Sequence, residues 1–167
     1  MIYDDLQAYG IQKASFKKLL GMYFTHPAFK LVVSYRLYAH WYKLGGMKKA
    51  IAKYLWCRAV KNSGCYISPK AKIGKGLWLP HATGIVIGDG AVIGENVTIY
   101  QNVTIGQKGE SAMYPIVKDG VTIYAGACVV GDITLGENVI VGANAVVLSD
   151  VSANTVVAGI PAKNIKK

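Results

Sequence analysis

An aliphatic residue returns every six positions between residues 67 and 147. Ten of these positions keep one phase once a break at residue 111 is allowed: Ile87, Ile93, Ile99, Ile105, Val117, Ile123, Val129, Leu135, Val141 and Val147. The same spacing joins Ile67, Ile73 and Leu79, ahead of a two-residue insertion. A small or β-branched residue lies four positions after many of them, as Ala91 follows Ile87.

A period of six fits neither an ordinary strand, which returns to one face every two residues, nor an α-helix, which does so every 3.6. It fits a short strand followed by a corner, and three such units close one triangular coil. Hexapeptide repeats are typical of a parallel β-helix. We therefore expect a mainly β fold in which the aliphatic side chains point inward and each coil buries its core against its neighbours. A β-sandwich with accidental spacing is disfavoured.

The break in the period predicts a loop. Residues 106–116 (GQKGESAMYPI) are polar, contain glycine and lie out of phase with the core positions. We expect this segment to project outward from its coil.

Residues 1–62 have no hexapeptide period. The strongly apolar segment 28–44 lies between Pro27, a favoured first residue of a helix, and the glycines at 45 and 46. Residues 47–61 place their apolar side chains on one helical face, opposite lysines. The sequence predicts an N-terminal segment of two or three helices over residues 1–62, followed by the β-helix over residues 63–167.

Charge distinguishes the two regions. Residues 1–62 hold eleven Lys and Arg against two Asp and Glu, which gives +9 of the net charge of +10. The aromatic residues of this segment have two open interpretations: packing against the first coil, or a basic, aromatic membrane-surface patch. Binding to nucleic acid is disfavoured because no recognised motif accompanies the charge.

Other features limit the location of the protein. The sequence contains no run of about twenty apolar residues, so we predict no membrane-spanning helix. The acidic start, Met1 to Asp5, does not resemble a signal peptide. The cysteines, Cys57, Cys65 and Cys128, show no paired metal spacing, which suits a reducing compartment. We expect a cytoplasmic protein that can associate with the inner face of the membrane.

Three motifs carry a resemblance to a known family. They are His81-Ala-Thr-Gly-Ile-Val86, the helix with Tyr35-Arg36 and His40-Trp41, and the ending Ala158-Gly-Ile-Pro-Ala162. The chain resembles the left-handed β-helix acyltransferases, and most closely their serine O-acetyltransferase branch. Its short N-terminal region is closer in length to the small exopolysaccharide O-acetyltransferases of that branch. The resemblance implies a left-handed parallel β-helix, acetyl-CoA as cosubstrate, and a homotrimer with sites between subunits.

Acetyl transfer from a thioester to a hydroxyl needs a base, and a neutral imidazole titrates in a suitable range. His81, at a predicted coil corner, is the candidate. His26, before Pro27, and His40, in an aromatic helix, are interpreted as structural. A β-helical carbonic anhydrase would need three zinc-binding histidines. Only His81 lies in the coils, so we predict no metal site.

Departures from the family pattern bear on the acceptor. The carboxylate that directly precedes the catalytic histidine is Pro80 here, and the loop histidine is Tyr114. An upstream aspartate used around the amino acid corresponds to Tyr66. Asp89 or a backbone carbonyl could orient His81.

The two tyrosines suit a sugar, so we expect O-acetylation of a sugar in a polysaccharide or its precursor. Serine O-acetylation for cysteine biosynthesis is the alternative, and a non-catalytic β-helical assembly module is a second one.

The resemblance also implies a path for acetyl-CoA in the groove between neighbouring subunits. Ala125 and Ala143 would be the small residues beside the pantetheine, and Gly106 would lie near the thioester. The tail lysines could bind the CoA phosphates as point charges: Lys163, Lys166 and Lys167.

Overall fold

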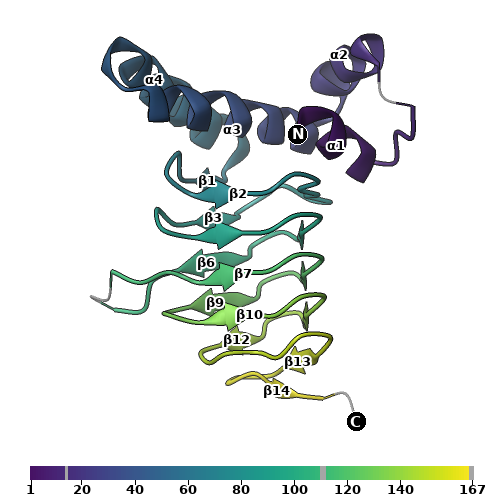
Figure 1. Ribbon diagram of the computed structural model, residues 1–167, viewed down its shortest axis with the longest axis vertical. Helices are drawn as coiled ribbons and strands as arrows, with labels where there is room; N and C mark the ends of the chain where they lie inside the picture. Colours follow the sequence, from purple (N-terminus) through teal and green to yellow (C-terminus); the bar gives the residue numbers. More distant parts are fainter. Residues whose placement is uncertain (14, 110–111, 166–167) are drawn as a thin grey trace.

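A helical cap lies across one end of a β-helix in the computed structural model, which describes residues 1–13, 15–109 and 112–165 (Figure 1). The cap contains α1 (Ile2–Ala8), α2 (Phe16–Thr25), α3 (Pro27–Leu44) and α4 (Gly46–Ser63). These are four helices, where the sequence predicted two or three. Short α1 has no apolar periodicity that would reveal it, but Asp4 and Asp5 in its first turn favour the positive end of the helix dipole.

The junctions between helices follow local chemistry. Pro27 is the first residue of α3, and the His26 side chain caps that helix by accepting a hydrogen bond from Phe29 N. Gly45, with a φ of 73°, ends α3, and α4 begins at the next residue. α4 ends at Ser63, after which Gly64 adopts the left-handed conformation.

Three columns of parallel strands form the faces of the β-helix. Face A contains β1 (Tyr66–Ile67), β3 (Val86–Ile87), β6 (Thr104–Gly106), β9 (Cys128–Val130) and β12 (Val146–Val147). Face B contains β2 (Lys72–Ile73), β4 (Val92–Ile93), β7 (Ile116–Val117) and β10 (Thr134–Leu135). Face C contains β5 (Thr98–Ile99), β8 (Thr122–Ile123), β11 (Ile140–Val141), β13 (Val156–Ala158) and β14 (Lys163–Asn164).

The periodic residues form the core, which confirms the predicted parallel β-helix. Every six-residue aliphatic position from Ile67 to Val147 is buried, and so are most of the small or β-branched residues four positions later, such as Ala91, Val97 and Ala127. Residues in register stack between coils: Ile99 pairs with Ile123, and Ile123 pairs with Val141. Only β14 departs from the parallel pattern among the described strands, because it folds back antiparallel to β13.

Two edges of face A matter for function. The His81 edge joins face C to face A and contains residues 80–84, 100–102, 124–126 and 142–144. The loop edge joins face A to face B and contains residues 88–90, the long connection between β6 and β7, and residues 131–132. Residues 107–109 and 112–115 of that connection are outside any strand, while Glu110 and Ser111 of the predicted loop lie outside the described residues.

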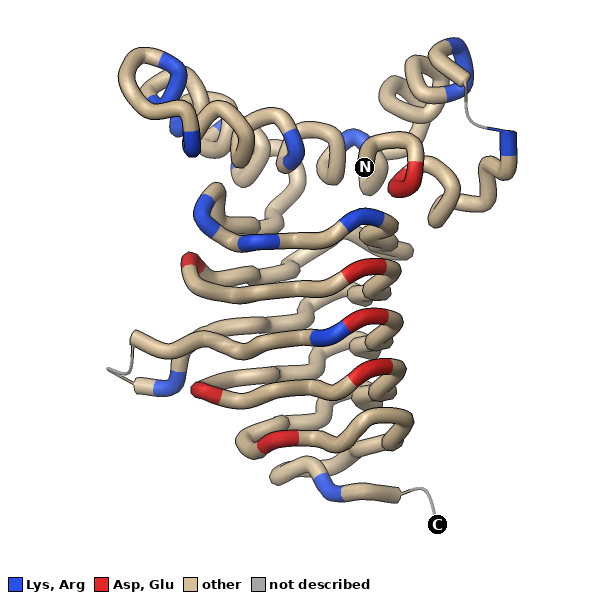
Figure 2. The backbone as a smooth tube through the Cα atoms, in the orientation of Figure 1, with Lys and Arg blue, Asp and Glu red and all other residues tan. Residues whose placement is uncertain are grey.

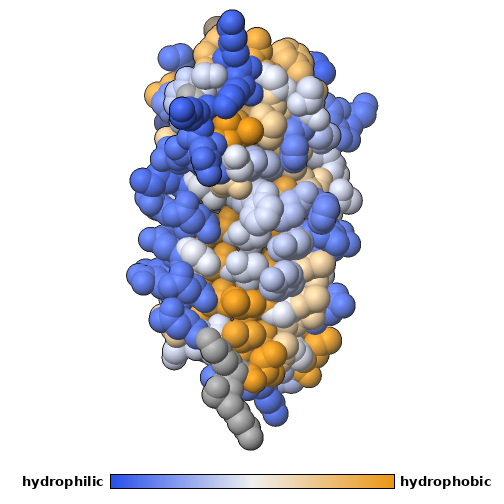
Figure 3. Space-filling model, turned by 90° about the vertical axis from the view of Figure 1, so that its right-hand side faces the viewer, coloured by the Kyte–Doolittle hydropathy of each residue, from blue (hydrophilic) through white to orange (hydrophobic). Residues whose placement is uncertain are grey.

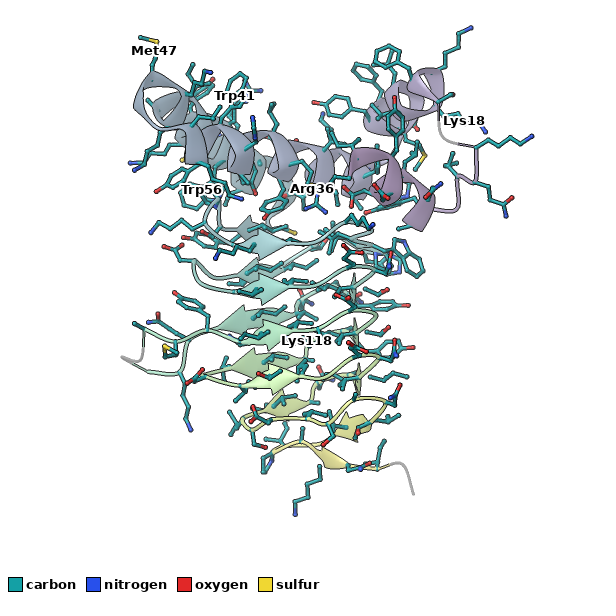
Figure 4. All side chains as sticks on the ribbon, in the orientation of Figure 1. Lys18, Arg36, Trp41, Met47, Trp56 and Lys118 are labelled. Atoms are coloured by element: carbon teal, nitrogen blue, oxygen red, sulfur yellow. The ribbon has the colours of Figure 1, made fainter. Side chains whose placement is uncertain are left out.

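Side chains of the cap bind the first coil. Arg36 points from α3 toward that coil (Figure 4), donates to the carbonyl oxygens of Ile73 and Gly74, and forms a two-pronged ion pair with Asp5. Asp5 in turn accepts a hydrogen bond from Leu77 N at 3.1 Å. The cap therefore holds the coil segment that leads to His81.

Candidate active site

His81 lies in the loop that closes the first coil. Thr83 N donates to the His81 carbonyl oxygen at 2.9 Å, and Asn102 N of the next coil donates to the Thr83 carbonyl oxygen, also at 2.9 Å. Gly84 has a φ of 64°, and a Cβ at this position would collide with the Asn102 side chain. These constraints hold the backbone of the loop while the His81 side chain remains exposed.

Aromatic residues continue the His81 edge down the coils. The ring of Tyr100 lies 6.3 Å from that of His81, centroid to centroid. Tyr124, one coil further, stacks on Tyr100 at 4.9 Å with an interplanar angle of 27°. The edge therefore offers flat apolar surfaces next to an accessible imidazole.

A pocket of about 670 Å³ opens beside His81. The coils contribute Trp78, Pro80, His81 and Tyr100, and the N-terminal segment contributes Ala8, Tyr9, Gly10 and His26. Sequence reasoning missed these N-terminal residues, and interpreted His26 as structural. Trp78 and Tyr100 carried a signal, because each directly flanks a core position of the repeat. Tyr9 and His26 carried none, since they lie far from His81 in the chain.

Ala125 and Ala143 lie in successive coils of the His81 edge. Asn144 N donates to the Ala125 carbonyl oxygen at 2.9 Å, and Gly126 N donates to that of Gln101 at 3.0 Å. The structure thus brings both alanines into one column with Gln101, along the same edge as His81. The side-chain oxygen of Gln101 is buried with no hydrogen-bond partner among the described residues.

Asp89, Gly106 and Tyr114 gather at the loop edge instead, across face A from His81. Asp89 accepts hydrogen bonds from Ser68 Oγ at 2.7 Å and from Lys70 Nζ. These two donors, Lys70 first, lower the pKa of the Asp89 carboxyl. The Tyr114 ring lies so close to Gly88 and Gly90 that a Cβ on either would collide with it. Within one chain the structure does not bring Asp89 to His81, so their pairing stays a prediction.

The remaining predicted residues lie elsewhere. Tyr66 points outward from face A and packs edge-on against Trp56 of α4, at 5.2 Å between centroids. Lys163 is exposed in β14, at the end of the β-helix furthest from the cap. Lys166 and Lys167 lie outside the described residues.

The titratable groups of the coils form no metal site in the part of the chain that the structure describes, where no three His, Cys, Asp or Glu side chains come together. Burial raises the pKa of the Cys65 and Cys128 thiols. Both therefore hold their protons more tightly than a free thiol, which argues against a nucleophilic role.

Comparisons with known proteins find the same six-residue repeat in this chain. The family model "Bacterial transferase hexapeptide (six repeats)" matches residues 114–149. A serine acetyltransferase of Escherichia coli strain K12 is 37% identical over 165 residues, which cover 98% of this chain and 60% of that protein. This chain thus spans well under two thirds of that relative's length.

Solved structures show the same similarity over the cap and the coils. A serine acetyltransferase from Brucella abortus strain S19, in complex with coenzyme A, aligns with a TM-score of 0.88 at 36% identity, over 99% of this chain and 66% of its own. A soybean serine acetyltransferase complexed with serine aligns with a TM-score of 0.86 at 34% identity, over 97% of this chain and 67% of its own.

Proposed function

Because the chain belongs to the family of hexapeptide-repeat transferases that includes these serine acetyltransferases, we propose that it is an acetyl-CoA-dependent O-acetyltransferase with His81 as general base. The observation that carries the proposal is an exposed imidazole beside a pocket, on an edge that continues past Ala125 and Ala143. His81 takes the proton of the acceptor hydroxyl as its oxygen attacks the thioester carbonyl. The new C–O bond forms, the C–S bond breaks, and the imidazolium returns the proton to the CoA thiolate.

Replacement of His81 tests this role. We expect His81→Ala to lower kcat by roughly 10²- to 10⁴-fold, the usual contribution of a general base, with CoA binding retained. Release of CoA thiol measures turnover, and calorimetry measures CoA binding. Near wild-type turnover in a folded His81→Ala protein would remove His81 from the mechanism.

We place the pantetheine of acetyl-CoA along the His81 edge, beside Ala125 and Ala143. A thin chain can pass there because both side chains are small and lie in successive coils. Ala143→Trp should raise the KM for acetyl-CoA strongly and leave the fold intact. Unchanged acetyl-CoA kinetics in the soluble variant would count against this path, and with it against the assignment of Gly106 and Lys163 to CoA.

The relatives favour L-serine as the acceptor, since they are named serine acetyltransferases and one solved structure contains serine. This reverses the order of preference that the sequence suggested, in which a sugar came first. L-serine is a small hydroxyl compound that the pocket beside His81 can accommodate by volume.

A sugar hydroxyl remains the second candidate for one reason. None of the side chains that line the pocket is acidic or basic apart from its two histidines, so the described residues offer a zwitterion no strong ion pair. Aromatic faces and neutral hydrogen-bonding groups suit a sugar ring. Mass analysis of the product after incubation with L-serine or with oligosaccharides decides between them. CoA release with neither would favour the non-catalytic assembly module.

We further propose a homotrimer, because the predicted site residues fall on two opposite edges of face A. In a three-fold assembly the loop edge of one subunit would meet the His81 edge of the next, and Asp89 and Tyr114 would come from the neighbour. Exposed apolar side chains on the coils, such as Ile116 and Ile140, and the hydrophobic surface of the lower coils in Figure 3 suit such contacts. Sedimentation of the active species as a monomer would contradict this.

Finally, we propose that the cap binds an anionic lipid surface. Figure 2 shows Lys and Arg over the helices and the first coil, and α2 exposes Phe16, Leu20 and Phe24 one helical turn apart. None of the described helices is both long and apolar enough to cross a bilayer. Binding to vesicles rich in phosphatidylglycerol but not to phosphatidylcholine vesicles would support surface attachment. Equal binding to both, or none, would contradict it.

A further inference from the structure

We propose that His26 binds the acceptor, as a second histidine of the pocket beside His81. The proposal rests on the O-acetyltransferase function above and names a residue that the three sequence motifs do not include. His26 lies at the junction of α2 and α3, 55 positions before His81 in the chain, yet both side chains line the same pocket of about 670 Å³.

One ring nitrogen of His26 is already occupied. Its Nδ1 accepts a hydrogen bond from Phe29 N at 3.4 Å, as the cap of α3. A neutral imidazole that accepts through Nδ1 carries its proton on Nε2. The tautomer, assigned from this hydrogen bond, therefore makes Nε2 a donor. Nε2 has no hydrogen-bond partner among residues 1–13, 15–109 and 112–165.

The ring is also held against Tyr9, edge to face, at 5.0 Å between centroids. Tyr9 in turn bonds through its hydroxyl to Leu79, accepting from the backbone N at 3.3 Å and donating to the carbonyl oxygen at 3.5 Å. Leu79 precedes His81 by two residues. The position of the His26 ring is thus fixed relative to the catalytic loop through a chain of direct contacts, which a binding residue requires.

The chemistry of the pocket indicates what His26 would bind. No Lys, Arg, Asp or Glu is among its lining residues, so within one subunit the pocket orients its occupant through neutral hydrogen bonds and aromatic contacts. His81 takes the proton of the reacting hydroxyl, and the Nε2–H of His26 can donate a hydrogen bond to a second oxygen of the same acceptor. In L-serine that oxygen belongs to the carboxylate, and in a sugar to another hydroxyl or to the ring.

The substitution His26→Asn tests this with the helix cap retained, because Asn is among the best capping residues. Loss of one hydrogen bond should raise the KM for the acceptor by roughly 5- to 10-fold. The KM for acetyl-CoA and kcat at saturating acceptor should stay within about twofold of wild type. His40→Asn is the matched control, because His40 is an exposed histidine of α3 outside this pocket. It should change none of the three constants.

A comparison of different acceptors separates the possible outcomes of the experiment. If L-serine is the substrate, ethanolamine, which lacks the carboxylate, should show the same KM with the His26→Asn variant as with the wild type. For a sugar substrate, deoxy analogues take the place of ethanolamine. An unchanged acceptor KM in the folded His26→Asn variant overturns the proposal, whereas a wild-type protein that acetylates no acceptor overturns the proposed function instead.

If the His26→Asn variant fails to fold, NMR of the wild-type protein tests the proposal instead. In wild-type protein labelled with ¹³C-histidine, the three Cε1–H signals can be assigned with the His40→Asn and His81→Asn variants. Acceptor should shift the His26 signal in a saturable manner, and CoA alone should not. A His26 signal indifferent to saturating acceptor would overturn the proposal.

Discussion

The backbone groups at the upper edge of the first coil and those at the boundaries between later coils find their hydrogen-bond partners in different ways. Between coils, backbone pairs with backbone: Val86 N donates to the Val103 carbonyl oxygen at 2.9 Å, and Thr104 N to that of Ala127 at 3.0 Å. The first coil has no coil above it. There the Tyr35 and Tyr38 hydroxyls donate to the carbonyl oxygens of Ala71 and Ile67, at 2.7 and 2.8 Å.

An open strand edge carries unpaired backbone groups that invite aggregation, so a solenoid needs a cap. At its far end this β-helix uses β14, which turns back antiparallel on β13. At the near end the cap covers the first coil, where α3 hydrogen-bonds to its backbone. The same cap that ends the β-helix also supplies Tyr9 and His26 to the pocket beside His81.

The two boundaries also differ in the forces that hold them. Coils adhere through stacked aliphatic side chains, such as Ile99, Ile123 and Val141. The cap adds a buried ion pair between Asp5 and Arg36, whose side chains are 1% and 6% exposed. Apolar stacking tolerates small changes in shape. A buried ion pair depends on both partners, because either charge left alone is costly.

The largest effect should therefore come from Arg36→Ala. This change leaves the Asp5 carboxylate buried without its cation and frees the carbonyl oxygens of Ile73 and Gly74. We expect a loss of about 3–5 kcal/mol in the free energy of unfolding, measured by urea denaturation. Amide exchange should rise in residues 66–79 more than in later coils.

Two controls separate charge from packing. Lys75→Ala breaks an exposed pair with Glu95 and should change the free energy of unfolding little. The double substitution Asp5→Leu with Arg36→Met removes both charges and should recover part of the loss. If Arg36→Ala proved as mild as Lys75→Ala, the cap would not depend on the ion pair.

The coil boundary should respond somewhat less to Ile123→Ala, in the middle of face C. Removal of a fully buried side chain stacked from both sides should cost about 2–5 kcal/mol, depending on how far the coils collapse into the cavity. Ile123→Val is the matched control and should cost about 0.5–1.5 kcal/mol. Equal costs for the two substitutions would show that the core is not close-packed there.

This difference explains what the sequence could predict. Each coil repeats the same local problem, so a period of six specifies the strands, the inward residues and the corners from Ile67 to Val147. The contacts of the cap do not repeat. Asp5 meets Leu77, and Arg36 meets Ile73, through residues with no shared pattern.

The residues of the candidate site also fall into two groups, those within the repeat and those that the cap contributes. His81, Ala125 and Ala143 lie within the repeat and along one edge, and the family motifs pointed to them. His26 and Tyr9 reach the pocket through the packing of α1, α2 and α3, which no local signal reveals. Tyr114 was assigned by motif position and Asp89 as a carboxylate that could orient His81, but one chain places both across face A from His81.

A smaller effect should appear at alkaline pH, through the tyrosines of the cap. Burial raises the pKa of Tyr35 from 10.0 to about 12. The unfolded chain loses this proton at a lower pH than the folded protein does. The free energy of unfolding should therefore keep its full value below pH 10 and fall as the pH rises toward 12. Tyr35→Phe should weaken that fall, whereas Tyr54→Phe, at an exposed position of α4, should not. Identical alkaline profiles for all three proteins would contradict the assignment.

The smallest effect should follow Lys70→Ala, at the loop edge. Hydrogen bonds from Lys70 and Ser68 lower the pKa of Asp89 below its ordinary 3.8. The stability that they provide is present above pH 3.8 and is lost as the pH falls through the lowered value. Both side chains of the Lys70–Asp89 pair are about half exposed, so solvent screens it and the thermal midpoint at neutral pH should stay near that of the wild type.

The informative measurement for Lys70→Ala is an NMR titration of the Asp89 carboxyl. We expect its pKa to rise toward the ordinary value, and Ser68→Ala should raise it by a smaller amount because that donor is neutral. Turnover adds a second reading. If Asp89 orients His81 of a neighbouring subunit, Asp89→Asn should lower kcat while Lys70→Ala changes it little. Equal kcat values for Asp89→Asn and the wild type would leave Asp89 with a role in the corner between faces A and B alone.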